Sequence, residues 1–532
     1  MIPSLISELP ESSHHLGSLI EHVCKKYQDQ PAFSFAKQTI SYKKFLKLSR
    51  AFAQQLQKSG IKAGDRMILQ LPNSIQLVAA AAGGFMAGVI VVPVNPLLTV
   101  RELEYIYQDA KPHLIVADYS SWQSRSHKPQ LAQAELWLNV CGSLKQSPIK
   151  RIWRDFRLNQ EQKTSLFHWH ALSDDQFKMA QLSSNDLAVL QYTGGTTGEP
   201  KGAMISHGNL LANLAQLEEL LSPRMATIKT TLTALPLYHT FAFTVNFLGM
   251  MNHGVHNILV ERQIGQGQII RLLKEQRVNC ITGVNSLFSA LLNSPGFNRH
   301  SWPDLKLAVT GGMAMRNMVA ASWLQLTGIP LIQGYGLSEA SPVVSCNPAE
   351  GDGGEGVGLP LANTEIAVCD EQGQRLSIDS VGEILVRGPQ VMQGYWNKPS
   401  DTDEVIDANG WLHTGDIGKI DAKGYLHLLD RKKDLILVSG FNVFPNEIEM
   451  VAEAHPDIRE AAAVGVPDHQ TGECVKLFVV AGCPGVSREE VASYCQQHLA
   501  AYKVPRHIQF VSELPRASVG KLLRRHLREK AV

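Results

Sequence analysis

What this sequence lacks most clearly is an excess of positive or negative charge. It has 50 Lys and Arg against 49 Asp and Glu in 532 residues. A near-neutral chain has no overall attraction to nucleic acid, and we expect no nucleic-acid partner. The 8 cysteines are scattered, without a Cys-x-x-Cys pair or a Cys/His cluster, which argues against a disulfide framework or a structural zinc site. No charged-then-apolar signal segment begins the chain, so we expect a reducing, cytoplasmic location.

A long hydrophobic run is also missing, although one segment comes close. No charged residue lies between Arg66 and Arg101, and residues 77–94 are almost all apolar. That length is enough to span a membrane. However, Ala and Gly dominate the first half, and Pro93 and Asn95 interrupt the end. A buried Ala-rich helix that runs into a buried strand of a parallel sheet is the better interpretation.

The order of apolar segments predicts the fold. A length of 532 residues favours about two or three domains. Helical and strand patterns alternate in the first part of the chain, which predicts layered α/β structure with parallel strands. Beyond about Glu350, short alternating strands such as Gly382–Arg387 predict an antiparallel subdomain. The charged run Arg431–Asp434 has the composition of a hinge, and a compact α/β pattern follows it.

We therefore expect an α/β fold of two domains. Residues 1–430 would form a large N-terminal domain of layered α/β subdomains plus a β-rich subdomain. Residues 431–532 would form a small, mobile C-terminal α/β domain, with the hinge near Lys433.

The stretch Tyr192–Gly202, YTGGTTGEPKG, suits a polyphosphate. It follows a short apolar run and holds four glycines, three threonines and one lysine. Glycine allows backbone N–H groups to turn toward a ligand, and Lys201 adds a positive charge. An ordinary Gly-rich turn is the alternative. The stretch is not a P-loop, because Pro200 precedes the lysine and Gly202 follows it; the proline favours an extended loop instead.

Several later apolar runs end in glycine or small polar residues. They include residues 233–236, 280–283, 307–312 and 332–336. Ligands of open α/β sheets bind at the carboxyl ends of strands. These ends are therefore expected to meet at one cleft together with the Gly-rich stretch.

Taken with four further segments, this stretch resembles the adenylate-forming superfamily of acyl-CoA synthetases, luciferases and peptide-synthetase adenylation domains, and most closely the bacterial long-chain fatty-acid–CoA ligases. The resemblance covers nearly the whole chain, in the family's order of motifs. The segments are residues 193–202, 236–243, 333–339, 409–433 and 514–521.

The resemblance implies a role for each matching residue. Lys521 would bridge the substrate carboxylate and the α-phosphate, Lys201 would assist the leaving pyrophosphate, and Glu339 would hold Mg²⁺. The implied catalytic residues are Lys521, Lys201, His239 and Glu339. The implied cofactor-binding residues are Thr193, Gly194, Gly195, Thr196, Thr197, Gly198, Lys201, Gly311, Gly312, Gly334, Tyr335, Gly336, Ser338, Asp416, Arg431 and Gly440.

The same resemblance implies finer roles. Tyr335 would stack on adenine, and Asp416 and Arg431 would contact the ribose. His239 would lie near the reacting carboxylate, with Phe243 at an aromatic gate to an acyl tunnel. The turn at residues 439–442 would approach the pantetheine of CoA once the small domain rotates.

The implied reaction uses ATP, Mg²⁺ and CoA in two steps, adenylation of a fatty acid and then transfer of the acyl group to the CoA thiol. Three alternatives stay open. The first is an acyl-AMP ligase that loads a carrier protein, and the second is a CoA ligase for a medium-chain or modified acid. The third is a non-catalytic protein that keeps the fold, which is disfavoured by the intact Lys201, Glu339, Asp416, Arg431 and Lys521.

Residues Pro148–Leu158, PIKRIWRDFRL, form a basic amphipathic pattern. It fits peripheral contact with the inner face of an anionic membrane, or simply a surface helix packed on its domain. The sequence leaves the oligomeric state open, with a homodimer as one hypothesis.

Overall fold

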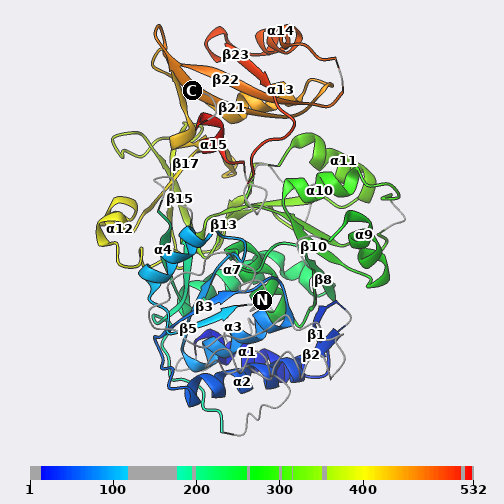
Figure 1. Ribbon diagram of the computed structural model, residues 1–532, viewed down its shortest axis with the longest axis vertical. Coiled ribbons are helices and arrows are strands. Elements are labelled where there is room, and N and C mark those ends of the chain that lie inside the picture. The colour runs from blue at the N-terminus through cyan, green and yellow to red at the C-terminus, as the bar shows by residue number, and fades with distance from the viewer. Residues whose placement is uncertain are drawn as a thin grey trace.

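The computed structural model describes residues 14–36, 38–117, 176–193, 199–260, 264–298, 302–313, 315–349, 356–483, 485–516 and 522–529. Within them the chain forms a large α/β body with a smaller α/β domain at one end, which Figure 1 shows in orange and red above the rest. The α/β fold and its large-then-small arrangement are as the sequence predicts. The boundary at residue 430 stays a prediction.

The first sheet of the large domain carries the Gly-rich hairpin. Its strand order is β5-β3-β4-β6-β7, with β3, β4, β5 and β6 parallel and β7 antiparallel to β6. The strands are β3 Arg66–Gln70, β4 Ile90–Pro93, β5 Leu114–Ala117, β6 Leu187–Thr193 and β7 Lys201–Ser206. Because Lys201 begins a strand, the predicted extended course after Pro200 is confirmed.

Buried helices cover this sheet. Ser41 caps helix α2, which begins after it, by accepting from Lys44 N. The apolar segment 77–94 is also as expected, a buried helix of 13 residues followed by strand β4. The helices are α1 Leu16–Lys26, α2 Tyr42–Lys58, α3 Ile75–Ala87, α4 Val100–Ala110 and α7 His207–Met225. Among the residues that the structure describes, no helix is long and apolar enough to cross a membrane.

A second, nine-stranded sheet has the order β14-β13-β12-β11-β10-β8-β9-β1-β2. Its central strands β12, β11, β10, β8 and β9 run parallel, so their carboxyl ends share one edge. Its strands are β1 Pro31–Phe35, β2 Gln38–Ser41, β8 Thr230–Thr233, β9 His256–Leu259, β10 Cys280–Gly283, β11 Leu307–Thr310, β12 Leu331–Gly336, β13 Val343–Cys346 and β14 Leu359–Pro360. The accompanying helices are the π-helical segment η2 Ala242–Gly249, α8 Met250–Asn252, α9 Gln266–Glu275, α10 Asn285–Leu292 and α11 Asn317–Thr327.

The β-rich subdomain is a four-stranded antiparallel sheet, which confirms the change of pattern after Glu350. Its elements are β15 Glu365–Cys369, β16 Gly382–Arg387, α12 Pro399–Val405, β17 Leu412–Ile420 and β18 Leu426–Arg431. The 3₁₀ turn η5, Lys432–Asp434, leads from β18 into the small domain.

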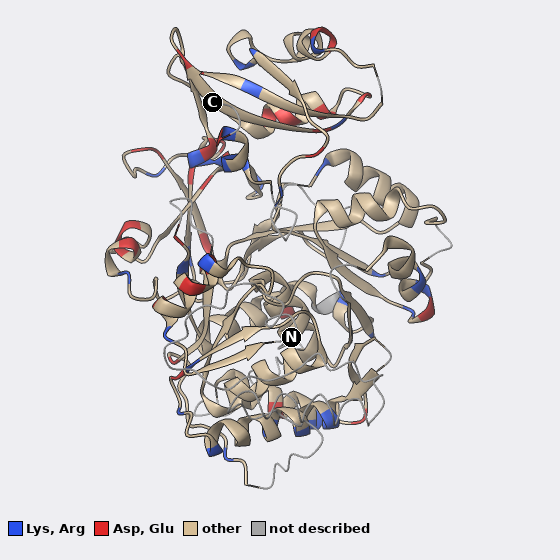
Figure 2. Ribbon diagram, in the orientation of Figure 1, with Lys and Arg blue, Asp and Glu red and all other residues tan. Residues whose placement is uncertain are grey.

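The small domain has its own sheet and its own core of buried aliphatic residues. Its elements are β19 Ile436–Val438, β20 Phe441–Val443, α13 Pro445–Glu453, β21 Ile458–Asp468, β22 Gly472–Ala481, α14 Arg488–His498, η6 Ala501–Lys503, β23 His507–Phe510 and α15 Arg524–Glu529. Lys, Arg, Asp and Glu gather around α15 and the strands beneath it, where the two domains meet (Figure 2).

Candidate active site

Parallel strands bring the predicted Gly-rich ends to one edge of the nine-stranded sheet. Cys280–Gly283 pairs in register with Leu307–Thr310, which pairs in turn with the residues of β12 that precede Gly334. At the end of β11 the hydroxyl of Thr310 is buried and has no hydrogen-bond partner. A buried polar group without a partner is costly in an apolar surround. The strand ends therefore present an unused hydroxyl where the sequence predicts a nucleotide.

Glycine is required by close approach at this edge. A Cβ on Gly336 would lie 2.0 Å from the carbonyl oxygen of Pro342, and a Cβ on Gly311 would lie 3.2 Å from that of Gly334. Gly312 has a φ of +76°. Any side chain at Gly336 would force the backbone apart, so this glycine is needed for the fold as well as for any ligand.

Of the Gly-rich stretch, the structure describes residues 192–193, which end β6, and residues 199–202, which lead into and begin β7. The Thr193 hydroxyl faces the carbonyl oxygen of Lys201 at 3.5 Å. The ring of Tyr192 covers Gly202, and its hydroxyl donates to Asp109 at 2.6 Å. Tyr192 is therefore a structural anchor of the hairpin.

Lys201 is held by two residues of a later segment. Its ammonium forms an ion pair with Asp401 of α12 and lies 5.3 Å from the ring centre of Tyr395. Residues 392–396 run alongside the hairpin, with Trp396 N donating to Gly202 O and Met204 N to Gly394 O. The lysine side chain is 19 % exposed, so a ligand can reach it.

Glu339 lies in the short 3₁₀ turn η4, Ser338–Ala340, directly after β12. One of its carboxylate oxygens accepts from the hydroxyl of Tyr395 at 2.9 Å. The neighbouring Ser338 hydroxyl accepts from Thr240 at 3.1 Å. Tyr395 thus links Glu339 to Lys201, and burial raises its pKa, so it stays a neutral hydroxyl donor.

A bulge in β17 turns Asp416 toward Tyr335. Glu383 pairs with Ile417, and Leu385 pairs with His413. Between these two pairs β16 advances by two residues and β17 by four. Extra residues of this kind leave backbone groups unpaired and re-aim side chains. The Asp416 carboxylate accepts from the Tyr335 hydroxyl at 2.6 Å and pairs with Arg431 Nε at 2.7 Å.

Two of these three residues, Tyr335 and Asp416, are buried, and Arg431 is partly exposed. Asp416 and Tyr335 are 5 % and 6 % exposed, and burial raises the pKa of Tyr335 well above its usual range. A carboxylate has about four lone-pair sites, so Asp416 can accept further hydrogen bonds. The structure thus brings Tyr335, Asp416 and Arg431 together. Stacking on adenine and contact with ribose stay predictions.

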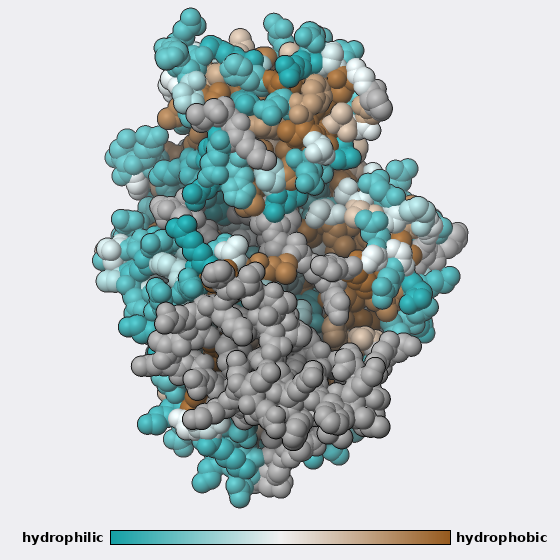
Figure 3. All heavy atoms as spheres, viewed as in Figure 1, coloured by the Kyte–Doolittle hydropathy of each residue, from teal (hydrophilic) through white to brown (hydrophobic). Residues whose placement is uncertain are grey.

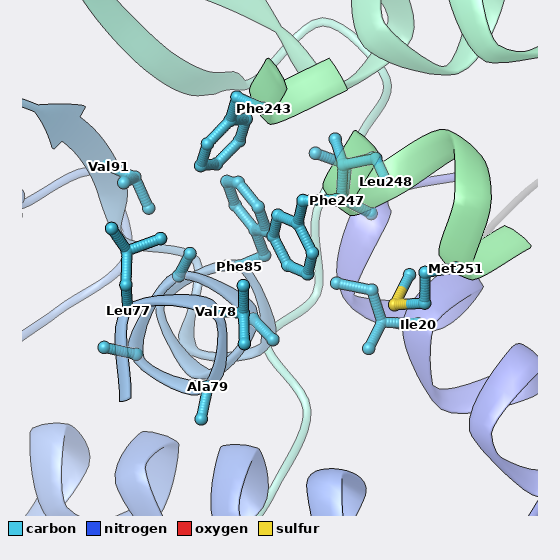
Figure 4. Packing of buried hydrophobic residues seen from close by; sticks show 14 of the residues in the cluster. Ile20, Leu77, Val78, Ala79, Phe85, Val91, Phe243, Phe247, Leu248 and Met251 are labelled. Carbon is cyan, nitrogen blue, oxygen red and sulfur yellow. The ribbon is translucent and has the colours of Figure 1, made fainter. Parts of the chain in front are cut away.

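The two residues predicted to meet the fatty acid have different surroundings. His239 follows β8 and is exposed. Phe243 belongs to η2 and is 2 % exposed, with its ring centre 6.1 Å from that of Phe85 and 5.4 Å from that of Phe247. Figure 4 shows these rings turned toward one another from η2 and α3. π-helical turns are frequent at functional sites, which is compatible with the predicted gate, but the gate stays a prediction.

The turn between β19 and β20 lies on the surface of the small domain. Ser439, Gly440, Phe441 and Asn442 are all exposed, and Gly440 has a φ of +82°. Phe441 stacks on Tyr502 at 5.0 Å, and Leu437 and Met450 are also exposed. Figure 3 shows hydrophobic atoms among hydrophilic ones on the small domain.

Some predicted residues lie outside the described part of the chain. They are Gly194, Gly195, Thr196, Thr197, Gly198, Lys521 and the segment Pro148–Leu158. The nearest described residues, Arg516 and Leu522, pair as an isolated bridge.

The residues present fit a nucleotide and a hard cation. Thr310 supplies an unused buried hydroxyl, Lys201 a positive charge and Asp416 a carboxylate with free acceptor sites. Mg²⁺ prefers oxygen ligands and is usually held by one or two carboxylates plus phosphates. The Glu339 carboxylate, which accepts from Tyr395, offers oxygen atoms of this kind, and its role as a metal ligand stays a prediction.

Sequence reasoning missed three residues of this region. Asp401 pairs with Lys201, Tyr395 donates to Glu339, and Glu383 accepts from Gly415 N at 3.1 Å and from Lys432 Nζ at 2.8 Å. Tyr395 ends residues 388–395, a further segment that resembles the bacterial long-chain fatty-acid–CoA ligases, and this resemblance was a usable signal. Asp401 and Glu383 carry none that distinguishes them from surface carboxylates.

The sequence matches two family descriptions. Residues 20–396 match the AMP-binding enzyme family, and residues 447–521 match the AMP-binding enzyme C-terminal domain. Proteins named long-chain-fatty-acid–CoA ligase are among the relatives. The one from Salmonella typhimurium is 41 % identical over 98 % of this chain and 95 % of the relative. The one from Bacillus subtilis is 34 % identical over 98 % of this chain and 96 % of the relative.

Solved structures agree over nearly the whole chain. ATP-bound MatB from Rhodopseudomonas palustris is 30 % identical, with a TM-score of 0.85 over 97 % of this chain and 99 % of that chain. A Mycobacterium tuberculosis fatty acyl CoA synthetase is 25 % identical, with a TM-score of 0.73 over 98 % of this chain and 99 % of that chain.

Proposed function

Because this chain belongs to the AMP-binding enzyme family, we propose that it is an acid–thiol ligase that joins a long-chain fatty acid to CoA at the expense of ATP. The names and near-complete coverage of the relatives support the activity and the acyl class. In the first step the fatty-acid carboxylate attacks the α-phosphate of ATP, which forms acyl-AMP and releases pyrophosphate. In the second step the CoA thiolate attacks the acyl carbonyl carbon, and AMP leaves.

The observation that carries the proposal is the set of contacts at the strand edge. Asp416 and Arg431 meet Tyr335 at the end of β12, and Glu339 follows four residues later with Tyr395 and Lys201 beside it. A carboxylate that approaches a triphosphate meets like charge, and each unit pair near 4 Å is worth about 4 kcal/mol at an effective dielectric of about 20. Positive groups placed beforehand offset that repulsion.

In the first step three side chains act on the charged groups of the substrates. They are Lys201, Lys521 and Glu339. Lys201 leaves Asp401 for the phosphates and stabilises the departing pyrophosphate. Lys521, from the other domain, neutralises the substrate carboxylate and the α-phosphate. Glu339 would hold Mg²⁺, and the bound ion would supply positive charge at the phosphates.

In the second step the small domain turns about the hinge at Lys433. Lys521 is withdrawn, and the exposed turn at residues 439–442 moves to the CoA side, where Gly440 admits the pantetheine. Such domain rotation is a common way to run two half-reactions in one site. Before the first step, Phe243 moves out of its aromatic contacts when the acyl chain enters, and His239 lies near the reacting carboxylate.

The finer surroundings belong to the same proposal. We place the enzyme in the cytoplasm, with peripheral contact to the inner membrane face through Pro148–Leu158 and a homodimer as working hypotheses. Sedimentation with anionic vesicles, with and without Arg151→Glu and Arg154→Glu, tests the first, and light scattering tests the second. Equal sedimentation of both forms would count against that segment.

The decisive experiment supplies palmitate, ATP, Mg²⁺ and CoA to the purified chain. We expect palmitoyl-CoA and AMP in equal amounts, with AMP release dependent on CoA. Lys201→Met and Lys521→Ala should lose most of the fatty-acid-dependent pyrophosphate release while the melting temperature holds, and Lys229→Met, an exposed lysine, is the matched control. Activity only with a carrier protein would overturn the CoA step.

A panel of fatty acids from short to long tests the acyl class. We expect the highest kcat/KM for long chains, because each buried CH₂ is worth about 0.8 kcal/mol. A maximum at medium or hydroxylated acids would replace the long-chain assignment without removing the ligase activity.

A further inference from the structure

Glu383 of β16 joins two parts of the candidate site through one carboxylate. Its side chain is 10 % exposed, and its two oxygens have different partners. Oε1 accepts from Gly415 N at 3.1 Å, and Oε2 accepts from Lys432 Nζ at 2.8 Å. Gly415 directly precedes Asp416, which contacts Tyr335 and Arg431. Lys432 directly precedes Lys433, the predicted pivot.

The first contact supports the β17 bulge. Gly415 has a φ of +68°, and its N–H points out of the ladder toward Glu383. Other polar groups of the bulge are hydrogen-bonded nearby. Asp416 N donates to Thr414 Oγ1, and Thr414 Oγ1 donates to Ile384 O. Without the Glu383 oxygen a partly buried N–H would lose its acceptor, and the bulge that aims Asp416 at Tyr335 would loosen.

The second contact fixes one end of the hinge. Lys432 opens the turn η5 and is tied by its side chain to β16 of the large domain. On the other side of the pivot, Arg528 of α15 donates to the carbonyl oxygen of Lys433 and to Asp434 at 3.0 Å. The large domain thus holds Lys432, and the small domain holds the carbonyl of Lys433 and the side chain of Asp434. The chain is therefore held by one domain just before the pivot at Lys433 and by the other domain just after it.

The same carboxylate also lies beside Cys369 and His413, with ligand atoms all within 4.8 Å of one another. These donor types suit zinc. However, the ammonium of Lys432 already neutralises Glu383, and burial raises the pKa of the Cys369 thiol, which disfavours the thiolate that a metal needs. The ion pair with Lys432 is therefore the better account of the cluster.

We propose that Glu383 is a positioning residue that couples the ribose side of the nucleotide site to the fixed end of the hinge. One oxygen holds the bulge that presents Asp416, and the other holds Lys432. The inference rests on the proposed function, since it assigns the two contacts to nucleotide binding and to domain rotation. Neither Glu383 nor Lys432 touches a reacting atom.

Three variants separate the two contacts. Glu383→Gln keeps an oxygen that can accept from Gly415 N but turns an amide donor toward the Lys432 ammonium. Lys432→Met removes only the hinge contact. Glu383→Ala removes both. Lys419→Met is the matched control, because Lys419 forms an exposed ion pair with Asp379 in the same sheet.

We expect Lys432→Met and Glu383→Gln to behave alike. Their kcat for acyl-CoA formation should fall about tenfold, because a slack pivot misplaces the groups of the small domain. Their Kd for AMP, measured by calorimetry, should stay within about twofold of wild type, since the bulge is intact. Glu383→Ala should in addition weaken AMP binding about tenfold. Lys419→Met should match wild type in both.

Two results would overturn the inference. One is a wild-type kcat for Lys432→Met, and the other is a wild-type Kd for AMP in Glu383→Ala. If Glu383→Ala does not fold, Glu383→Gln and Lys432→Met still decide the hinge contact.

Failure of the proposed function is distinguishable. If the wild type forms no acyl-CoA from any acid, hydrogen exchange of the peptide that contains residues 430–434 replaces kcat. Lys432→Met must then speed exchange there about threefold or more, which corresponds to losing one partly exposed ion pair. Exchange at the wild-type rate would overturn the inference.

Discussion

At the scale of the residue, the site is organised by side chains that hold other side chains. Tyr395 donates to Glu339, Asp401 neutralises Lys201, and Glu383 steadies the backbone beside Asp416. A group that must act on a charged substrate gains from being held in place before the substrate arrives. These three holding residues should therefore affect ligand affinity more than fold stability.

Tyr395 offers the clearest test at this scale. Tyr395→Phe keeps the ring beside Lys201 but removes the hydroxyl that orients Glu339, and loss of a hydrogen bond to a metal-binding carboxylate typically weakens metal affinity about 10- to 100-fold. We expect the Mg²⁺ concentration for half-maximal pyrophosphate release to rise by about tenfold. Tyr494→Phe, in the small domain, is the control. An unchanged Mg²⁺ requirement would remove Glu339 from the metal site.

The sequence was enough to find the residues that match a motif, and not enough to find those that hold them. Lys201, Tyr335, Asp416 and Arg431 were all predicted, and the structure brings Tyr335, Asp416 and Arg431 into direct contact. Asp401 contacts Lys201 across 200 residues of sequence. No local pattern encodes such a pair, because it depends on how α12 packs against the hairpin.

At the scale of the element, the sequence predicted those helices and strands whose position depends on residues within the same segment. Pro200 predicted the extended course into β7, and the Ala- and Gly-rich composition of residues 77–94 predicted the buried helix that runs into β4. The bulge in β17 could not be predicted, since its extra residues are defined only relative to the register of β16. The turn that aims Asp416 is thus a property of a strand pair and not of one segment.

The contact between α1 and α7 predicts a pH dependence of stability. His207 begins α7, and its Nδ1 accepts from Leu16 N of α1 at 3.3 Å. Burial lowers its pKa from 6.5 to about 3, so the folded state binds this proton more weakly than the unfolded state. Its contribution to stability is therefore complete above pH 6.5 and is lost as the pH falls toward 3, by up to about 1.4 kcal/mol per pH unit.

His207→Asn tests this dependence, because the amide oxygen can still accept from Leu16 N but does not titrate. The variant should be less stable than wild type at pH 7, since a smaller side chain leaves a cavity. Its melting temperature should nevertheless fall less than that of wild type between pH 7 and pH 5. His498→Asn, at an exposed position, should keep the wild-type slope. Parallel curves for His207→Asn and wild type would contradict the assignment.

At the scale of the whole molecule, the two domains touch away from the hinge through Arg316 and Glu453. Arg316, at the start of α11 in the large domain, pairs with Glu453 of α13 and donates to Arg459 O at 3.3 Å. Glu453 also accepts from Ala461 N, so the carboxylate is fixed on its own domain. This ion pair favours the domain orientation seen here over any in which the small domain has turned.

Arg316→Gln should release that orientation. A partly exposed ion pair is worth up to about 1 kcal/mol, which corresponds to about a fivefold change in the population of the two orientations. We expect faster hydrogen exchange in the peptide that contains residues 453–461, and a similar but smaller effect when salt is raised for the wild type. Arg277→Gln breaks an ion pair with Asp304 inside the large domain and should leave this peptide unchanged. The turn at residues 439–442 is exposed in the present domain orientation. Releasing that orientation should therefore speed the CoA step relative to adenylation. A slower CoA step in Arg316→Gln would mean that this orientation already serves thioester formation.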